Sequence, residues 1–171
     1  FTSKLSDNIG LVGSSINFLP KGSKDSEYFS KKLNKPEPFT HVQTTSFALT
    51  SESFQLLKNK DFFILNEELN HLDIILRWEI SLSQTLLENS FYISSILPTY
   101  NIYNENTILN YSNTLKKGNP LRQSAFYGRT ISPYENMFIK TNNDQISQRN
   151  LASYTFTSLE KYFTSNSLDD D

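Results

Sequence analysis

Two polar side chains at alternate positions, His41 and Gln43, are the first residues in the sequence that could do chemistry together. They belong to residues 40–49, where the alternation of side-chain character predicts a β-strand. Alternate residues of a strand lie on one side of a sheet, so the imidazole and the amide would face the same space. There they could bind ligand hydroxyl groups, or the imidazole could complete a metal site. The alternative is that both are hydrogen-bonded residues of the core or of a sheet edge.

A carboxylate, Glu79, directly follows the only tryptophan of the chain, Trp78. Apolar and polar residues recur at helical spacing through residues 73–90, which predicts a helix in this region. We place Glu79 at a helix start, just after Trp78. A carboxylate in such a position can accept a proton from a reacting group. The alternative is a surface carboxylate that the helix dipole stabilises.

Two cations and two aromatic residues complete the candidate set. Arg129 and Lys140 flank a segment that begins at Pro133. Arginine can bind an anion with two parallel hydrogen bonds, whereas lysine acts as a point charge. Tyr134 or Trp78 could stack on a ligand ring. The alternatives are solvated surface charges and aromatic rings that belong to the core.

The elements that must position these residues alternate between strands and helices, which is typical of an α/β layer architecture. We expect a strand in residues 8–17, a surface loop in 19–38 with at most one helical turn, a strand in 40–49, a helix capped by Thr50, the helix 73–90, a strand in 91–97, a helix start at Pro133, and a last helix after Ser153.

Composition narrows the function classes. The 171 residues fit one domain of ordinary size, and the net charge of −2 offers no basic excess for a nucleic acid backbone. There is no cysteine, which excludes a disulfide, a thiolate nucleophile and Cys-based metal sites. No stretch approaches the roughly 20 apolar residues of a membrane span. We therefore expect a cytoplasmic protein without a transmembrane segment, with a membrane-peripheral location as the alternative.

Four segments, in this order, resemble polysaccharide glycosyltransferases with a GT-A-like fold, of the kind found in bacterial rhamnan-type synthesis and in large DNA viruses of algae. They span roughly residues 5 to 143. The segments are Ile9-Gly-Leu-Val-Gly-Ser-Ser-Ile-Asn17, Pro38-Phe-Thr-His-Val-Gln-Thr-Thr-Ser-Phe-Ala-Leu-Thr50, Arg77-Trp-Glu-Ile-Ser-Leu-Ser83 with Leu86, and Gly128-Arg-Thr-Ile-Ser-Pro-Tyr-Glu-Asn-Met-Phe-Ile-Lys-Thr-Asn142.

This resemblance implies transfer of a sugar from a nucleotide-sugar donor to a glycan acceptor, with Mn²⁺ or Mg²⁺ as the cofactor of the complete domain. It implies that Glu79 is the catalytic base and that it faces a cleft shared with His41 and Gln43. Arg129 and Lys140 would neutralise the departing diphosphate. The remaining binding residues would be Trp78 and Tyr134, and His41 is also a candidate metal ligand.

In that family the nucleotide-binding half, with its Asp-x-Asp metal motif, lies upstream of the first matching segment. Here the motif occurs only at Asp169–Asp171, in an acidic tail. We therefore expect residues 1–150 to be the acceptor-side part of a GT-A-like sheet flanked by helices, and 151–171 to be a C-terminal helix and tail. The strand at 9–12 would then lack a neighbour, and the chain alone would be poorly soluble. The alternative is a non-catalytic glycan-binding or structural α/β module.

Overall fold

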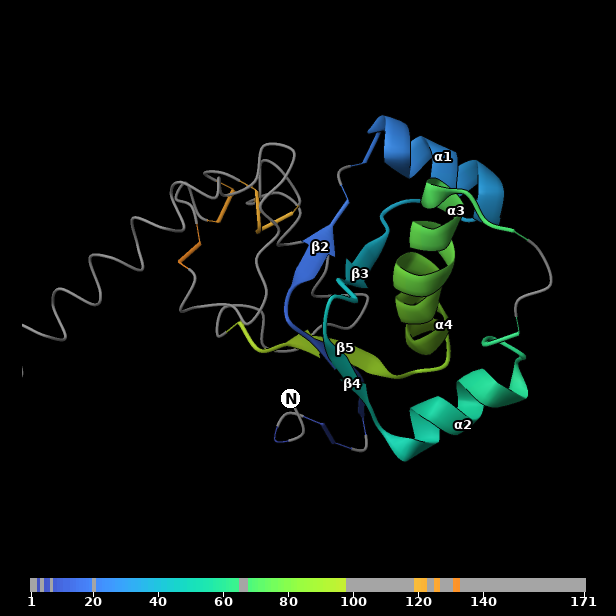
Figure 1. Ribbon diagram of the computed structural model, residues 1–171, viewed down its shortest axis with the longest axis vertical. Coiled ribbons are helices and arrows are strands. Elements are labelled where there is room, and N and C mark those ends of the chain that lie inside the picture. The colour runs from blue at the N-terminus through green and yellow to red at the C-terminus, as the bar shows by residue number, and fades with distance from the viewer. Residues whose placement is uncertain are drawn as a thin grey trace, which may run out of the picture.

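The computed structural model describes residues 3, 5–6, 8–19, 21–64, 68–97, 119–122, 125–126 and 131–132. This part of the chain is mixed α/β, with a three-stranded sheet, a separate two-stranded ribbon and helices packed against them (Figure 1). The α/β class expected from the sequence is therefore confirmed. The helices expected at Pro133 and after Ser153, and the division at residue 150, lie outside the described residues.

The central strand of the sheet is β1 (Ile9–Gly13), and all five of its residues are buried. It pairs antiparallel with β4 (Phe47–Leu49) and parallel with β5 (Tyr92–Ser95). Burial on both faces explains why this segment is a continuous apolar run. The expectation that this strand lacks a neighbour is wrong, because hydrogen-bonded strands flank it on both sides.

Two glycines of β1 allow close contacts that a larger residue would prevent. A Cβ atom at Gly10 would lie 2.1 Å from Ser53 Oγ, and one at Gly13 would lie 2.0 Å from Val42 Cγ1. The Gly10 carbonyl also accepts a hydrogen bond from the backbone N–H of Thr50 at 3.1 Å. The missing side chains therefore let neighbouring segments pack directly on the central strand.

The ribbon is formed by β2 (Ile16–Phe18) and β3 (Thr40–Val42), which pair antiparallel. The expectation of one strand across residues 40–49 is wrong, because the chain turns between β3 and β4. The two halves have different partners: β3 pairs with β2, whereas β4 pairs with β1. The segment that was expected to form a single strand is thus divided between two sheets.

A helix that the sequence did not predict, α1 (Lys24–Leu33), occupies half of the expected surface loop. Its N-cap is Ser23, whose side chain accepts a hydrogen bond from the backbone N–H of Ser26. The helix ends at Asn34, which adopts a left-handed conformation with φ of 51°. Under α1 lies a second, smaller core, whose buried members are Phe29, Phe39 and Ile80.

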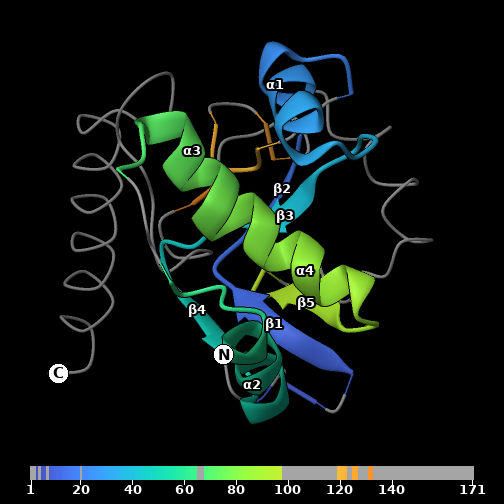
Figure 2. The same ribbon diagram turned by 90° about the vertical axis from the view of Figure 1, so that its right-hand side faces the viewer.

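The next helix, α2 (Ser51–Asn59), begins where the sequence predicts it. The Thr50 side chain accepts a hydrogen bond from the backbone N–H of Ser53 at 3.2 Å, which confirms the predicted N-cap. On the inner face of α2, Leu57 is fully buried. The helix therefore packs beside the sheet at the level of β1 and β4 (Figure 2).

One continuous helix spans residues 71–88. It consists of α3 (His71–Ile75), a π-helical segment η2 (Leu76–Ser81) and α4 (Leu82–Glu88). Figures 1 and 2 show this helix beside β3 and above the sheet. The long helix predicted for residues 73–90 is confirmed, although the widened turn in its middle has no counterpart in the prediction.

The start of this helix differs from the expectation. Its N-cap is Asn70, whose side chain accepts a hydrogen bond from the backbone N–H of Asp73 at 3.0 Å. Glu79 therefore does not open a helix; it lies in the π-helical segment, in the middle of the long helix. The sequence contains an Asn-x-x-Asp capping pattern at residues 70–73, and the helix begins there rather than just after Trp78.

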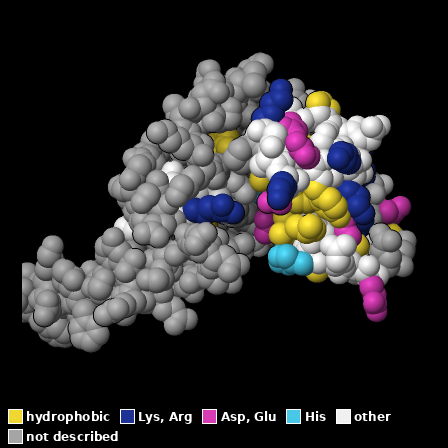
Figure 3. Space-filling view, turned by 90° about the horizontal axis from the view of Figure 1, so that it is seen from above, with side chains coloured by type: hydrophobic (Ala, Val, Ile, Leu, Met, Phe, Trp, Pro, Cys, Tyr) yellow, Lys and Arg dark blue, Asp and Glu magenta, His cyan; other side chains and the backbone are white. Residues whose placement is uncertain are grey.

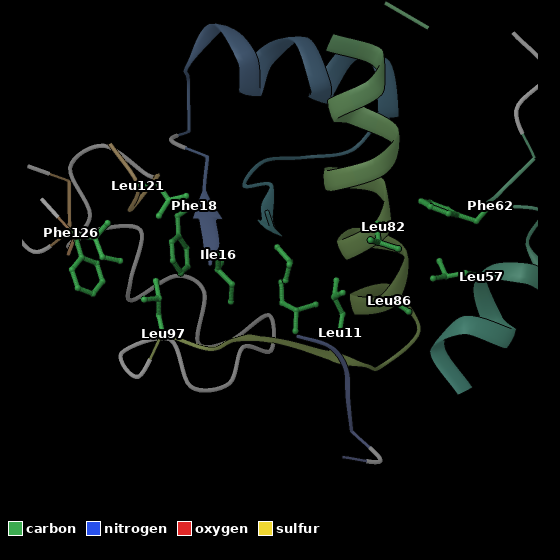
Figure 4. Packing of buried hydrophobic residues seen from close by; sticks show 13 residues of the cluster. Leu11, Ile16, Phe18, Leu57, Phe62, Leu82, Leu86, Leu97, Leu121 and Phe126 are labelled. Atoms are coloured by element: carbon green, nitrogen blue, oxygen red, sulfur yellow. The ribbon is translucent and has the colours of Figure 1, made fainter. Parts of the chain in front are cut away.

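The main core joins the sheet, the ribbon and the long helix (Figure 4). Figure 4 shows Leu82 and Leu86 on the long helix, with Leu11 and Ile16 on one side of it and Leu57 and Phe62 on the other. Among the described residues, none of the helices is both long and apolar enough to cross a membrane. The buried members of this core are Leu11, Ile16, Phe18, Val42, Leu57, Phe62, Leu82, Leu86, Ile93, Leu97, Leu121, Phe126 and Ile131.

Candidate functional site

The site is organised by the way the long helix docks on β3. The backbone N–H of Val42 donates to Ser83 Oγ at 2.9 Å, and the Gln84 side-chain amide donates to the Thr40 carbonyl at 2.8 Å. Both backbone groups lie on the edge of β3 that faces away from β2. The side chains of Ser83 and Gln84 thus form the hydrogen bonds that a neighbouring strand would otherwise form with this edge of β3. These directed bonds fix both the position and the rotation of the helix relative to β3.

One helical turn before Ser83, the same face of the helix carries Glu79. Glu79 Oε1 accepts a hydrogen bond from Thr44 Oγ1 at 3.4 Å, and Glu79 Oε2 lies 3.8 Å from His41 Nε2. The Glu79 side chain is 17% exposed, whereas that of His41 is 2% exposed. The carboxylate therefore forms the outer part of the pair, and the imidazole lies behind it.

The orientation of the His41 ring is fixed by the backbone. His41 Nδ1 lies 2.9 Å from the Phe39 carbonyl oxygen, which can only accept a hydrogen bond. Nδ1 therefore carries a proton. On the other side of the ring, His41 Nε2 lies 3.4 Å from the side-chain nitrogen of Asn17, the residue opposite it on β2. In a neutral ring Nε2 accepts this hydrogen bond.

Gln43 continues the same polar row. Its side-chain oxygen accepts a hydrogen bond from Ser15 Oγ at 2.5 Å, and its backbone N–H donates to the Ser15 carbonyl at 3.0 Å. Both His41 and Gln43 are 2% exposed. They share one side of the ribbon as the alternation predicts, and both are buried and hydrogen-bonded. The structure thus brings Glu79 to His41, and Gln43 lies one step further along the row.

Trp78 lies in a different environment from its neighbour Glu79. Its ring stacks on Phe63 with centroids 6.3 Å apart and meets Phe62 edge to face at 5.6 Å. The Arg77 guanidinium lies 5.7 Å from both the Trp78 and the Phe62 ring centroids and donates to the Phe62 carbonyl. Trp78 is partly buried against the main core. The ring is thus part of an aromatic cluster rather than of the Glu79 and His41 pair.

A groove of about 490 Å³ opens on another face of the long helix. Neither Glu79 nor His41 lines it, so this groove is not the cleft expected around them. Figure 3, which views the molecule from the side of α1, shows basic and acidic side chains around a hydrophobic patch. The groove contains both signs of charge. Its lining residues are Lys32, Leu33, Lys60, Asp61, Phe62, Glu68, Leu69, Asp73, Leu76, Arg77, Ser81 and Thr85.

Three candidate binding residues, Arg129, Tyr134 and Lys140, lie outside the described residues, as does the acidic tail. Within the described ranges, no group of three or more His, Cys, Asp or Glu side chains could hold a metal ion. His41 and Glu79 supply two ligand atoms, and Mg²⁺ requires near-octahedral coordination. These residues alone do not fit the cofactor that the resemblance implies.

Sequence reasoning missed the supporting residues of the site. Thr44 contacts Glu79, Asn17 contacts His41, and Ser83 contacts the edge of β3. A signal existed for Ser83, because it follows Glu79 by four positions and so shares a helix face with it. No local signal existed for Asn17, because its position opposite His41 depends on the register of two strands distant in sequence.

Comparison with known proteins adds no relative: no family model, no curated protein and no solved structure matches this chain. The contacts between Glu79, His41 and their neighbours are therefore the basis for a functional assignment.

Proposed function

We propose that this chain is the acceptor-side part of a glycosyltransferase, which moves a sugar from a nucleotide-sugar donor to a glycan acceptor. The observation that carries the proposal is the placement of Glu79: a partly exposed carboxylate held by Thr44 and backed by the buried imidazole of His41. The four sequence segments that resemble GT-A-like glycosyltransferases support it, because Glu79 and His41 belong to two of them.

The geometry suits a general base. A carboxylate that takes a proton from an acceptor hydroxyl must reach the substrate and keep a fixed orientation. Glu79 meets both requirements, because its side chain is 17% exposed while the helix that carries it is bonded to β3. It also lies in a π-helical segment, a distortion often found at functional sites.

In an inverting transfer, the acceptor oxygen attacks the anomeric carbon while Glu79 removes the hydroxyl proton. The bond between the anomeric carbon and the diphosphate oxygen breaks, and the diphosphate leaves with the electron pair. When bound, a divalent cation would offset the charge of this leaving group. In this proposal this chain supplies the base, and its described residues do not form a site for the cation.

A substitution of Glu79 tests the proposal in the full-length protein. Purified protein would be incubated with Mn²⁺, oligosaccharide acceptors and a panel of UDP-, GDP- and dTDP-sugars, and nucleoside diphosphate release would be measured. We expect Glu79→Gln to lower kcat by about 100-fold or more, because the amide cannot accept a proton. Donor binding, measured by titration calorimetry, should stay within about twofold.

The matched control is Glu88→Gln, at an exposed carboxylate of the same helix that pairs with Lys35. It should leave kcat unchanged. Equal turnover in wild type and Glu79→Gln would refute the base assignment. Absence of transfer and of donor binding with every sugar of the panel would refute the enzyme itself.

A second candidate function is a non-catalytic glycan-binding module. It is favoured by the exposed rings of Phe54 and Phe63, which lie 5.4 Å apart and are 44% and 41% exposed. Exposed aromatic rings can stack on the apolar faces of sugars. This candidate predicts that oligosaccharide binding, measured by calorimetry, is lost in Phe63→Ala and retained in Glu79→Gln, without any turnover.

A further inference from the structure

The groove beside the long helix lies apart from Glu79 and has the size of a ligand site. Its volume of about 490 Å³ falls within the range of small-molecule sites in proteins. Its walls come from the end of α1, the turn after α2, residues 68–69 and one face of the long helix. Along the helix it extends from Asp73 to Thr85, which is about 18 Å at a rise of about 1.5 Å per residue. The groove is therefore long enough for an extended ligand.

Three polar side chains of the long helix line the groove in one row. Arg77, Ser81 and Thr85 follow one another at intervals of four residues, so each lies about one helical turn from the next. Within the part of the chain that the structure describes, neither the Ser81 nor the Thr85 hydroxyl takes part in a hydrogen bond. The helix thus offers two hydroxyl groups and a guanidinium to a ligand.

The position of Arg77 in this row is fixed by two carbonyl groups. Its Nη2 donates to the Phe62 carbonyl at 2.7 Å and to the Ile64 carbonyl at 2.6 Å. Its Nε is buried without a hydrogen-bond partner, and no described carboxylate pairs with the guanidinium. An arginine side chain has five N–H donors. Arg77 therefore keeps hydrogen-bonding capacity that the described residues do not use.

The other walls of the groove carry charged side chains without ion pairs. Lys60, Asp61 and Glu68 are exposed, and none of them forms a salt bridge with another described residue. By contrast, Asp73 is already engaged, because its carboxylate lies 3.5 Å from Lys32 Nζ. The groove thus presents charges of both signs whose donors and acceptors remain open to a ligand.

This mixture of groups restricts the class of ligand. An anion would meet the carboxylates of Asp61 and Glu68, and a cation would meet Lys60 and Arg77, so part of the groove would repel either one. A hydroxyl group both donates and accepts hydrogen bonds, so it pairs with carboxylates and with cations. No described strand edge lines the groove, so the backbone of an extended peptide would lack its usual partners. A neutral ligand rich in hydroxyl groups fits these side chains best.

We propose that this groove binds a neutral oligosaccharide. Its cations donate hydrogen bonds to the hydroxyl oxygens, its carboxylates accept hydrogen bonds from the hydroxyl groups, and Leu76 contacts the apolar side of a sugar ring. This inference goes beyond the proposed function, because neither Glu79 nor His41 lines the groove and binding there requires no transfer. It also differs from the module suggested by Phe54 and Phe63, whose exposed rings do not line the groove.

Titration calorimetry of the 171-residue chain tests the class of ligand. The probes are neutral tetrasaccharides of glucose, mannose and N-acetylglucosamine, and the comparators are anionic tetragalacturonate, cationic tetraglucosamine and a hexapeptide of alternating lysine and glutamate. We expect at least one neutral probe to bind once per chain, and every comparator to bind at least about 10-fold more weakly. Tighter binding of a comparator, or no binding of any neutral probe at about 10 mM, would overturn the inference.

Two single substitutions locate the binding site. Lys60→Ala removes a donor and Glu68→Ala removes an acceptor at exposed positions, so we expect each variant to fold and to bind the neutral probe about 10-fold more weakly. The matched controls are Lys58→Ala and Glu52→Ala, at exposed positions of α2 outside the groove, and they should leave the Kd within about twofold. Unchanged affinity in both groove variants would overturn the assignment.

A third variant, Phe63→Ala, separates the groove from the exposed aromatic rings. If the sugar binds in the groove, this variant should retain the wild-type Kd within about threefold, because the Phe63 ring does not line it. Loss of binding in Phe63→Ala, with wild-type affinity in Lys60→Ala, would place the sugar on the rings and overturn the inference. None of these measurements depends on transfer, so a protein that binds in the groove without turnover would refute only the proposed function.

Discussion

Two neighbouring residues on the long helix, Trp78 and Glu79, lie in regions held together by different forces. On the Trp78 side, aromatic rings and the Arg77 guanidinium pack together, with contacts that depend mainly on shape and buried area. On the Glu79 side, Ser83 and Gln84 bond to single backbone atoms of β3. The first region packs apolar rings against the main core, whereas the second determines where the helix sits.

The difference shows how one helix can combine stability with a defined site. Apolar contacts are non-directional and lose free energy roughly in proportion to the area removed. A buried hydrogen bond restricts direction, and loss of one partner leaves the other unsatisfied. We therefore expect substitutions on the Trp78 side to affect stability most, and substitutions on the Glu79 side to affect the geometry at His41 most.

The largest effect on stability is expected at Phe62. Its ring is 8% exposed and contacts Trp78, Phe63 and Arg77. Phe62→Ala would leave a cavity among these side chains and lower the free energy of unfolding by about 3–5 kcal/mol. Urea denaturation measures this change. In the folded protein the ¹⁵N signals of the His41 side chain should stay in place, and a shift of these signals would show that the two regions are not separate.

An intermediate effect is expected at Ser83. Ser83→Ala leaves the buried N–H of Val42 without its acceptor, which should cost about 1–3 kcal/mol of unfolding free energy. The His41 signals should also shift, because the helix loses a bond that places Glu79. Ser51→Ala is the matched control, at an exposed position of α2, and should change stability by less than about 0.5 kcal/mol. Equal losses in the two variants would contradict the role of Ser83.

The smallest effect is expected at Phe63, which is 41% exposed although it stacks on Trp78. Phe63→Ala should lower the free energy of unfolding by about 1 kcal/mol, because much of the ring is already in water. The same urea measurement gives the value. A loss that equals that of Phe62→Ala would mean that the exposed ring supports the core, and would weaken the case for Phe63 as a sugar-binding surface.

Much of the framework could be predicted because its signals are local. The buried strand β1, the Thr50 cap of α2 and the long helix depend on apolar runs, capping residues and periodicity within a few residues. The helix α1 was missed because few of its residues are apolar and because Pro20, Pro36 and Pro38 lie near it in the sequence. Its start signal was present at Ser23, with acidic residues in the first turn and lysines in the last.

The site was predictable only in part. His41 and Gln43 share a side because strand alternation is a local property. The contact of Glu79 with His41 depends on how the helix docks on β3, which no local pattern in the sequence specifies. The divided segment 40–49 and the pairing of β1 on both sides depend on long-range strand partners, which no local pattern specifies.

The bond from Val42 to Ser83 has a consequence for amide hydrogen exchange. The amide of the next residue, Gln43, donates to the Ser15 carbonyl, so its exchange requires β2 and β3 to separate. The Val42 amide donates to a buried hydroxyl of the long helix, so its exchange requires the helix to move away from β3. Two consecutive amides thus report different motions: the first follows separation of the helix from β3, and the second follows opening of the strand pair.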